Sequence, residues 1–519
     1  MPTVAERGVG VVVHEVLVVG SGFGGSVAAL RLAQKGYRVT VVEAGRRWRP
    51  EDFATSPWQA HRLLWAPWLG WRGIARLRVR RRLIALTGIG VGGGSLVYAG
   101  VHYRPDATAF HDLCWDPSLD WEDELAPHYA SAERILGTAP VPRQAAGDDA
   151  LRRAADALGA PDGFHATRVG IHFGPPGRVV PDPYFDGRGP ARAGCSECGR
   201  CTLGCRVGAK NSLDHNYLHL AERAGADIRP LTEARTLVPQ PDGTWRVRTR
   251  HGTGISRRHA VLSAHQVVLA AGAWGTAELL HRSRPYLPRL SSALGTRTRT
   301  NREVFAVVSA EGFDIGPGVA ISSALRPRPG LLVQLCRLGP GSHPAALLAR
   351  TTRPSWRDFG RRSAVLFAME QGDSHLTSRY RRGRLTLHRG SSQPEPVRLA
   401  TAEAVAHRYA RQIGGRAAPL WNTALGLPVT AHLLGGCPIG SDPATSVADL
   451  YHRIHGYPSL HITDASAVPG NLGANPALTV TAMAERACAA WPAAGQPDRR
   501  PAQSEPYRHL QLPKTQDAL

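Results

Sequence analysis

Residues 16–43 constrain the fold of this chain more than any other segment. An apolar run at 16–19 is followed at once by Gly20, Gly22 and Gly25, spaced as Gly-x-Gly-x-x-Gly. The pattern of 26–35 favours a helix, and the apolar run at 39–42, with Glu43 after it, favours a second strand. This order of elements is typical of a β-α-β unit that binds a dinucleotide.

Each residue of this unit has a physical reason for its type. Gly20 permits the tight turn, Gly22 lets the backbone approach a pyrophosphate, and Gly25 lets the helix pack on the strand. The free N–H groups and the dipole of the helix N-terminus favour an anion at that place. Glu43 follows Gly22 by 21 positions and suits hydrogen bonds from a ribose. The alternative is a glycine-rich turn with a structural role only.

The length and charge of the chain limit its organisation and its partners. Its 519 residues exceed what one core organises, so we expect two or more large units. The formal net charge of +22 suits nucleic acid or an anionic membrane. The arginines are spread along the whole chain, however, and no zinc-finger, RNA-recognition or helix-turn-helix pattern is present. We therefore expect no nucleic-acid partner.

The sequence also bears on localisation. No apolar run approaches the roughly 18 residues of a membrane span. The N-terminus lacks the charged region, the apolar stretch and the cleavage site of a signal peptide. We expect a cytoplasmic protein, with peripheral contact to a membrane left open.

Residues 58–83 have a composition that suits peripheral contact with a membrane. Trp58, Trp65, Trp68 and Trp71 stand among leucines, and a run of arginines follows. Aromatic rings suit a membrane interface and the cations suit anionic headgroups, so the segment resembles an interfacial lid. The alternative is ordinary: the tryptophans lie in the core and the arginines form a solvated face.

A second glycine-rich run occupies residues 86–101. Gly88, Gly90 and Gly93 repeat the Gly-x-Gly-x-x-Gly spacing, but no acidic residue follows a second strand at the required distance. A second dinucleotide unit is therefore not expected. One interpretation is a loop that lies flat against a planar cofactor, and the other is a plain glycine loop.

Four of the eight cysteines stand close together, at Cys195, Cys198, Cys201 and Cys205. The spacing Cys-x2-Cys-x2-Cys-x3-Cys supplies the ligand set of an iron–sulfur cluster or a structural zinc ion. The bacterial ferredoxin run has proline after its fourth cysteine, whereas Arg206 stands here. Reduced structural thiols are the alternative.

Four blocks of sequence resemble the signatures of the glucose–methanol–choline (GMC) flavoprotein oxidoreductases. They are residues 90–99, 270–280, 431–437 and 464–479. Residues 181–185, 195–211 and 498–508 are similar to blocks of the actinobacterial cholesterol oxidases within that family. The resemblance covers most of 14–310 and 428–510 and is thin across about 340–425.

The fold class follows from the nucleotide-binding signals at both ends of the chain and from this resemblance. We expect an α/β (α+β) protein with a Rossmann-like FAD-binding domain built from discontinuous segments and an inserted substrate-binding domain that contains a β-sheet. The expected segments are an FAD-binding part with the Trp/Arg-rich lid (8–104), a mixed helical and loop part (105–194), the continued FAD-binding domain with the cysteine cluster (195–310), the substrate-binding domain (311–427), the C-terminal FAD and active-site part (428–495) and a mobile tail (496–519).

The resemblance implies FAD as the cofactor. The cofactor-binding residues that it implies are Gly20, Gly22, Phe23, Gly25, Glu43, Gly93, Gly94, Ser95, Tyr98, Ala234, Asp464 and Ala465. The first glycines and Glu43 would hold the ADP half, and Ala234 would touch the adenine region. Residues 93–98 would lie along the flavin, and Asp464 would face the ribityl chain or the pyrophosphate. Glycine often follows this aspartate in the family, whereas Ala465 stands here.

His432 and Asn475 match the active-site pair of the family. Oxidising an alcohol removes a proton from oxygen and a hydride from carbon. A neutral imidazole accepts or orients the proton, and an amide holds the same oxygen so that the C–H bond points at the flavin. The resemblance therefore implies oxidation of a hydrophobic secondary alcohol, with a sterol such as cholesterol expected, O2 as acceptor and H2O2 as product.

Three points stay open. Steroid isomerisation needs a carboxylate, for which Glu370 is a candidate, although a structural glutamate is the alternative. A flavin dehydrogenase that passes electrons to a quinone or a protein through a cysteine-bound cluster is a second function. A non-catalytic, basic membrane- or nucleic-acid-binding protein with an inert flavin fold is a third.

Overall fold

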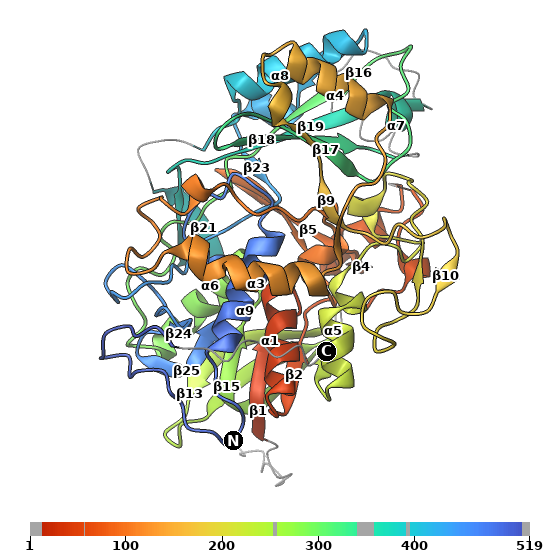
Figure 1. Cartoon of the computed structure of the whole chain (residues 1–519). Helices are drawn as coiled ribbons and strands as arrows, with labels where there is room; N and C mark the ends of the chain where they lie inside the picture. The colour runs from red at the N-terminus through yellow and green to blue at the C-terminus, as the bar shows by residue number, and fades with distance from the viewer. Residues whose placement is uncertain (1–12, 57, 253–256, 340–357, 391–394, 511–519) are drawn as a thin grey trace.

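Two β-sheets organise the protein, as a computed structural model shows (Figure 1). The structure describes residues 13–56, 58–252, 257–339, 358–390 and 395–510. The mixed α/β class predicted from the sequence is confirmed.

The first sheet has eight strands and contains the β-α-β unit. Its strands are β12 (Asp227–Arg229), β2 (Val39–Val42), β1 (Val13–Val19), β15 (Arg258–Leu269), β14 (Trp245–His251) and β13 (Thr232–Pro239), with β25 (Tyr457–Ile462) beside β15 and β24 (Arg453–Ile454) beside β25. β1 pairs in parallel with both β2 and β15, and β25 runs parallel to β15. Residues 16–18 of β1 are fully buried, which is why this strand is a continuous apolar run rather than an alternating one.

Four helices gather around this sheet. They are α1 (Phe23–Gln34), α3 (Trp121–Ile135), α5 (Tyr217–Arg223) and α9 (Ala477–Ala489). α1 packs against both α5 and α9, and α3 packs against α9 (Figure 1). α9 is buried along almost its whole length, because its neighbours cover it on every side.

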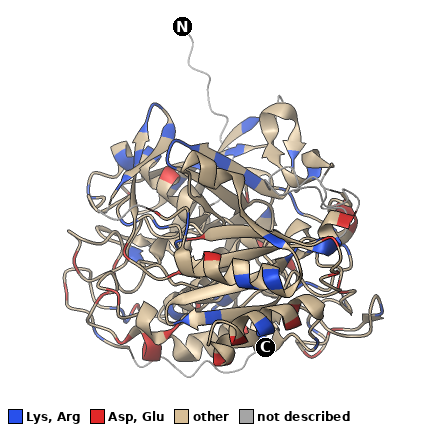
Figure 2. Cartoon of the chain, turned by 90° about the horizontal axis from the view of Figure 1, so that it is seen from above, with Lys and Arg blue, Asp and Glu red and all other residues tan. Residues whose placement is uncertain are grey.

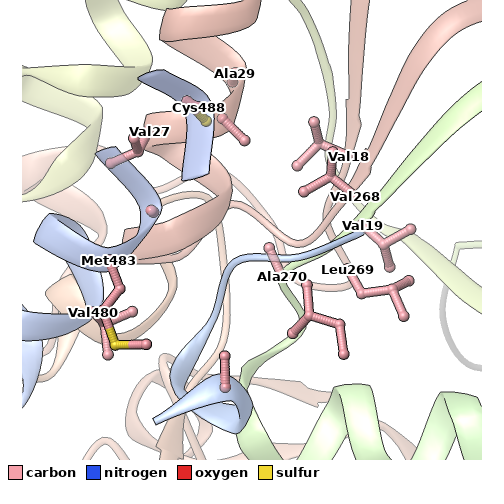
Figure 3. Packing of buried hydrophobic residues seen from close by; sticks show 14 of the residues in the cluster. Val18, Val19, Val27, Ala29, Val268, Leu269, Ala270, Val480, Met483 and Cys488 are labelled. Atoms are coloured by element: carbon pink, nitrogen blue, oxygen red, sulfur yellow. The ribbon is translucent and has the colours of Figure 1, made fainter. Parts of the chain in front are cut away.

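The two ends of the chain meet in this core. Figure 3 shows residues of β1, β15, α1 and α9, and Ala270 directly after β15: Val18, Val19, Val268, Leu269, Val27, Ala29, Val480, Met483 and Cys488. Burying each larger apolar side chain stabilises the fold by about 1.5–3 kcal/mol. Polar contacts join the same helices: the Arg31 guanidinium lies 2.7 Å from the Glu485 carboxylate, and Lys35 Nζ donates to the carbonyls of Cys488 and Ala489 at 2.8 and 3.0 Å.

The second sheet has six antiparallel strands. In spatial order they are β22 (Arg416–Pro419), β16 (Val304–Ser309), β19 (Ser363–Glu370), β18 (Leu331–Arg337), β17 (Ile321–Arg328) and β8 (Phe164–Ala166). Helices α4 (Ala146–Asp156) and α8 (Ala400–Gln412) cover one face (Figure 1). Because side chains alternate along a strand, Phe305, Gln334 and Phe367 point to the other face.

A small three-stranded sheet joins the glycine loop to the C-terminal block. Its strands are β5 (Ala75–Arg80), β6 (Leu83–Gly88) and β23 (Val429–Thr430), and β6 pairs with both others. The remaining elements are α2 (Ala60–Leu63), β3 (Trp65–Ala66), β4 (Trp71–Arg72), β7 (Thr138–Pro140), β9 (Arg168–Gly170), β10 (Val179–Val180), β11 (Arg192–Ala193), α6 (Gly272–Ser283), α7 (Phe359–Arg362), β20 (Leu376–Arg381) and β21 (Arg384–Arg389).

The sheets draw on interleaved segments, which bears on the expected division of the chain. β8 comes from the segment 105–194 and β16 from 195–310, yet both pair within the second sheet. That sheet therefore begins earlier in the sequence than residue 311. Residues 340–357 and 391–394 of the expected substrate-binding domain lie outside the described residues.

Residues 498–508 differ from the mobile tail expected there. The buried Arg500 guanidinium stacks over the Trp491 ring at 5.1 Å and contacts His461 Nε2 at 3.2 Å. Tyr507 Oη accepts a hydrogen bond from Arg486 at 3.1 Å. The tail is held because it supplies an arginine to a buried aromatic side chain; residues 511–519 lie outside the described part.

Candidate active site

The fingerprint glycines have two different surroundings. Gly20 has a φ of +102°, and a Cβ added there would lie 2.3 Å from the Ala270 carbonyl oxygen. A Cβ on Gly25 would lie 2.0 Å from the Gly20 oxygen. Gly22, in contrast, has a φ of −73°, and apart from its neighbours along the chain no described residue has an atom within 4 Å of its added Cβ. Backbone packing thus requires Gly20 and Gly25, whereas Gly22 borders open space.

This open space lies at the N-terminus of α1. Gly22 is the N-cap residue, and within the described structure no side chain caps the helix. The first N–H groups of α1 are thus available to an external anion, which the helix dipole also favours. The residues present fit the pyrophosphate of a dinucleotide.

Glu43 holds the two glycine-rich loops together. Its buried carboxylate accepts hydrogen bonds from the Ser21 N–H and hydroxyl at 3.1 and 2.8 Å. It also accepts from the Gly45 N–H at 2.9 Å and the Gly90 N–H at 3.2 Å. Beside any ribose contact, Glu43 therefore has a structural function that its spacing alone did not predict.

The second glycine loop lies directly against the first. A Cβ on Gly93 would approach Gly22 Cα to 2.7 Å, and one on Gly94 would lie 3.4 Å from the Phe23 ring. The Phe23 and Tyr98 rings meet edge to face at 5.5 Å. The structure thus brings residues 93–98 beside the fingerprint.

Side chains of this loop are partly used within the protein. The buried Ser95 hydroxyl donates to the Gly92 carbonyl at 2.7 Å and accepts from the Leu213 N–H at 3.0 Å. Tyr98 donates its hydroxyl to the Asn211 carbonyl at 2.9 Å, and burial raises its pKa. Ser95 therefore shapes the loop, and what the loop offers a ligand at this position is backbone.

The C-terminal block contacts the fingerprint through Thr463 and Asp464. A Cβ on Gly24 would lie 1.9 Å from the Thr463 oxygen, so the first turn of α1 rests on this backbone. The buried Asp464 carboxylate accepts from the Ser466 N–H at 2.9 Å, the Gly272 N–H at 2.8 Å and the hydroxyls of Ser466 and Thr276 at 2.5 Å. Burial raises the Asp464 pKa despite these four bonds. Its side chain therefore joins the start of α6 to the C-terminal block.

The remaining two predicted cofactor residues lie at the edges of this region. The Ala465 carbonyl accepts from the Gly435 N–H at 2.9 Å. Ala234 lies at a bulge of β13, two residues after Thr232, whose N–H donates to the Glu43 carbonyl at 2.7 Å. The start of β13 thus approaches the end of β2, beside the fingerprint.

His432 and Asn475 reach the same face of the second sheet. The His432 ring lies 5.5 Å from the Phe367 ring, and the Asn475 amide oxygen accepts from Gln334 Nε2 at 2.6 Å. Phe367 and Gln334 are direct cross-strand partners in β19 and β18. Because these partners are adjacent, the structure brings His432 and Asn475 into one neighbourhood. Phe305, stacked on Phe367 at 4.7 Å, extends this surface with an aromatic ring.

A partner of His432 that the sequence did not reveal is Glu303. Its carboxylate is fully buried, with Oε1 2.5 Å from His432 Nδ1 and Oε2 accepting from the Ala431 N–H at 2.8 Å. Nothing around residue 303 marks it in the sequence, because it is a single acidic residue before an apolar strand. Gln334 was missed because it is a single polar residue inside an apolar strand.

Glu370 has a different environment. Its carboxylate accepts from Arg302 at 2.8 and 2.9 Å and is also paired with Arg328. The structure thus favours the structural alternative for this residue.

The four clustered cysteines line one cavity near the second glycine loop, together with Lys210. None of the eight cysteines, which all lie in the described residues, forms a disulfide. Among the helices that the structure describes, none is long and apolar enough to cross a membrane.

Comparisons with known proteins agree with this geometry. A family model described as FAD dependent oxidoreductase matches residues 15–333, and one described as GMC oxidoreductase matches residues 397–484. The chain is 42% identical to a cholesterol oxidase of Mycobacterium tuberculosis, over 96% of this chain and 94% of that protein. It is 33% identical to a cholesterol oxidase of Acinetobacter baumannii, over 92% and 94% of the two chains.

A solved structure shows the same fold at low sequence identity. The crystal structure of pyridoxine 4-oxidase from Mesorbium loti superposes with a TM-score of 0.63 and 17% identity, covering 92% of this chain and 98% of that one. The loops around Gly22, the C-terminal block and these relatives lead to one conclusion: the chain belongs to the GMC oxidoreductase family of FAD-dependent enzymes.

Proposed function

We propose that this enzyme oxidises a 3β-hydroxysteroid such as cholesterol to the ketone, with O2 as acceptor and H2O2 as product. The observation that carries the proposal is the placement of His432 and Asn475 around Phe367 and Gln334. An imidazole, an amide and an apolar floor are what a hydrophobic alcohol needs. The identity to two cholesterol oxidases supports the sterol as substrate.

Different side chains accept the proton of the alcohol, hold its oxygen and contact its hydrocarbon part. Glu303 lies at Nδ1 of His432, which leaves Nε2 to accept the hydroxyl proton. Gln334 donates to the Asn475 oxygen, which leaves the Asn475 N–H groups to hold the alcohol oxygen. FAD, when bound, would supply the acceptor for the hydride from carbon. The rings of Phe305 and Phe367 exclude water and contact the hydrocarbon skeleton.

We assign the cofactor to the residues described above. Gly20, Gly22, Phe23, Gly25, Glu43 and Ala234 are assigned to the ADP half, and Gly93, Gly94, Ser95, Tyr98, Asp464 and Ala465 to the flavin and its linker. Ser95 and Asp464 act through the loops that they shape, because their side chains are bonded within the protein. Glu370 is not assigned to isomerisation, since two arginines hold its carboxylate.

We also propose that the protein contacts an anionic membrane through an exposed apolar patch. Its members are Trp58, Leu64, Trp68, Leu69, Leu77 and Val79, with the exposed Arg72, Arg81 and Arg82 beside them. Basic residues also occur on elements across the molecule (Figure 2). β5 carries two residues of the patch and pairs with β6, which leads to the glycine loop. A sterol held in a bilayer would thus be delivered near the site.

Trp65 does not belong to this patch. It is 7% exposed, against 77% for Trp68, and Arg76 lies over its ring at 5.6 Å. Replacing Trp68 and Leu69 with serine should therefore lower sedimentation with anionic vesicles. Leu113→Ser is the matched control, because Leu113 is 96% exposed elsewhere. Equal binding by all three proteins would contradict the membrane proposal.

A substrate panel tests the catalytic proposal. The purified holoenzyme is given cholesterol, other 3β-hydroxysteroids and long-chain primary alcohols, while peroxide and ketone are measured. We expect sterol-dependent peroxide with one ketone formed per peroxide. His432→Ala and Asn475→Ala should each slow flavin reduction by about 10²–10⁴-fold with FAD still bound. Turnover of the primary alcohols alone would refute the sterol assignment.

A further inference from the structure

Four cysteines from one short segment surround a cavity that the proposed reaction does not use. Cys195, Cys198, Cys201 and Cys205 all line it, and its volume is about 210 Å³. Cys205 lines the same space as the other three. It therefore has no need of a second site, unlike the fourth cysteine of the ferredoxin run.

The spacing of the sulfur atoms argues against a single metal ion. A tetrahedral zinc ion with Zn–S bonds of 2.3 Å holds its sulfurs about 3.8 Å apart. In the described part of the chain, three ligating atoms lie mutually within 4.8 Å only at Asp112, Cys114 and Asp373. The four cysteines thus line the cavity, but no three of their sulfur atoms lie close enough together to bind one metal ion.

Backbone donors point at three of these sulfurs. The N–H groups of Glu197, Lys210 and Ala320 donate to the sulfurs of Cys195, Cys205 and Cys201 at 3.3, 3.4 and 3.5 Å. Such bonds stabilise thiolates, and N–H···S bonds help to set the potential of iron–sulfur clusters.

A buried cation completes the cavity wall. Lys210 is 2% exposed, and its Nζ donates to the carbonyls of Cys201 at 2.8 Å, Leu96 at 2.9 Å and Tyr98 at 3.2 Å. A cluster with four thiolates carries negative charge, which this ammonium group would offset.

We propose that Cys195, Cys198, Cys201 and Cys205 hold a [4Fe–4S] cluster in this cavity, beside the flavin loop. One lysine side chain joins the cavity wall to residues 96 and 98 of that loop. The proposed cluster site does not depend on which alcohol the enzyme oxidises. Only its function in electron transfer rests on the proposed function.

A bound cluster would supply a second acceptor, beside O2, for the electrons of the alcohol. Oxidation of each alcohol to the ketone releases two electrons and two protons, and His432 accepts the hydroxyl proton. An external one-electron redox protein would receive the electrons through the cluster. Two of its molecules would then be reduced for each ketone formed, and both protons would leave to water.

Metal analysis of the whole protein tests the site. The holoenzyme is produced with added iron, purified without oxygen and assayed for iron, zinc, sulfide and FAD. We expect about four iron and four sulfide per chain and, after dithionite, the electron paramagnetic resonance signal of a reduced cluster. One zinc per chain without iron, or FAD-replete protein without iron, would overturn the proposal.

Variants locate the cluster. Cys198→Ser should lose most of the iron while keeping FAD, because Cys198 is exposed and its replacement spares the core. Cys336→Ser is the matched control, since Cys336 is a nearby half-buried thiol outside the cavity wall. Equal iron in Cys198→Ser and Cys336→Ser would refute the assignment.

Anaerobic addition of the substrate alcohol tests the electron route. Bleaching of the flavin, with appearance of the electron paramagnetic resonance signal of the reduced cluster, supports the route. Bleaching without that signal refutes it. An unbleached flavin in iron-replete protein would refute the sterol assignment alone, because dithionite still reports the cluster.

Discussion

Replacing Gly22 with valine separates FAD binding from folding. Valine accepts a φ of −73°, and apart from the neighbours along the chain no described residue has an atom within 4 Å of the added Cβ. An N-cap change from glycine to valine costs about 1 kcal/mol or less, a small part of the 5–15 kcal/mol of a stable domain. The apoprotein should therefore keep its fold.

The same side chain fills the space at the N-terminus of α1. A pyrophosphate displaced from there loses two charge-assisted hydrogen bonds worth about 1.5–3 kcal/mol each. At 1.4 kcal/mol per tenfold, the loss of about 3–6 kcal/mol weakens FAD binding by about 10²–10⁴-fold.

The assay compares apoproteins, because bound FAD stabilises the wild type by mass action. FAD is removed, its binding is titrated by calorimetry, and thermal unfolding is followed without ligand. Gly312→Val is the matched control, since its Cβ also meets no described atom but lies away from the fingerprint. Gly25→Val is the steric opposite and should fail to fold, with its Cβ 2.0 Å from the Gly20 oxygen. A Gly22→Val protein whose FAD Kd stays within threefold of wild type would refute the pyrophosphate placement.

Three further changes test other parts of the structure. Glu303→Gln should slow flavin reduction in stopped flow by about 10²-fold with unchanged FAD content, because His432 loses the carboxylate that lies 2.5 Å from its Nδ1; an unchanged rate and pH profile would contradict this. Burial raises the Glu395 pKa from its usual 4.5 to about 7, so the folded state keeps the proton and stability falls as pH rises between these values. The gain in unfolding free energy from Glu395→Gln should thus grow by about 2–3 kcal/mol between pH 5 and pH 8, as urea titration measures; a constant difference would contradict it. Lys35→Met should cost about 1–3 kcal/mol, because carbonyls at the end of α9 lose their donor; a urea midpoint equal to wild type would contradict this.

Local signals predicted the β-α-β unit well. β1, α1 and β2 depend on apolar runs and on the conformational freedom of Gly20, all of which lie within 30 residues. Long-range pairing was not predictable in this way. β8 joins the second sheet from far upstream, since its partner β17 and not its own composition determines its place.

The candidate site shows the same division. Sequence blocks identified His432 and Asn475, whose assignment stays a prediction, but Glu303 and Gln334 meet them only after the second sheet forms. Residue type also does not decide burial in the Trp-rich segment. Trp65 lies in β3, pairs with Arg72 of β4 and is buried, whereas Trp68 lies in the short 3-10 helix that follows and is exposed.

The packing of α9 against α1 has a consequence for biosynthesis. Residues 35–476 separate the two helices in sequence, and translation at 5–20 residues per second needs about 20–90 s to produce them. During that time the nascent β-α-β unit lacks the helix that covers it and the backbone at Thr463 on which its first turn rests. We therefore expect flavin loading to follow the synthesis of nearly the whole polypeptide, since until then an apolar face of α1 has no partner to cover it.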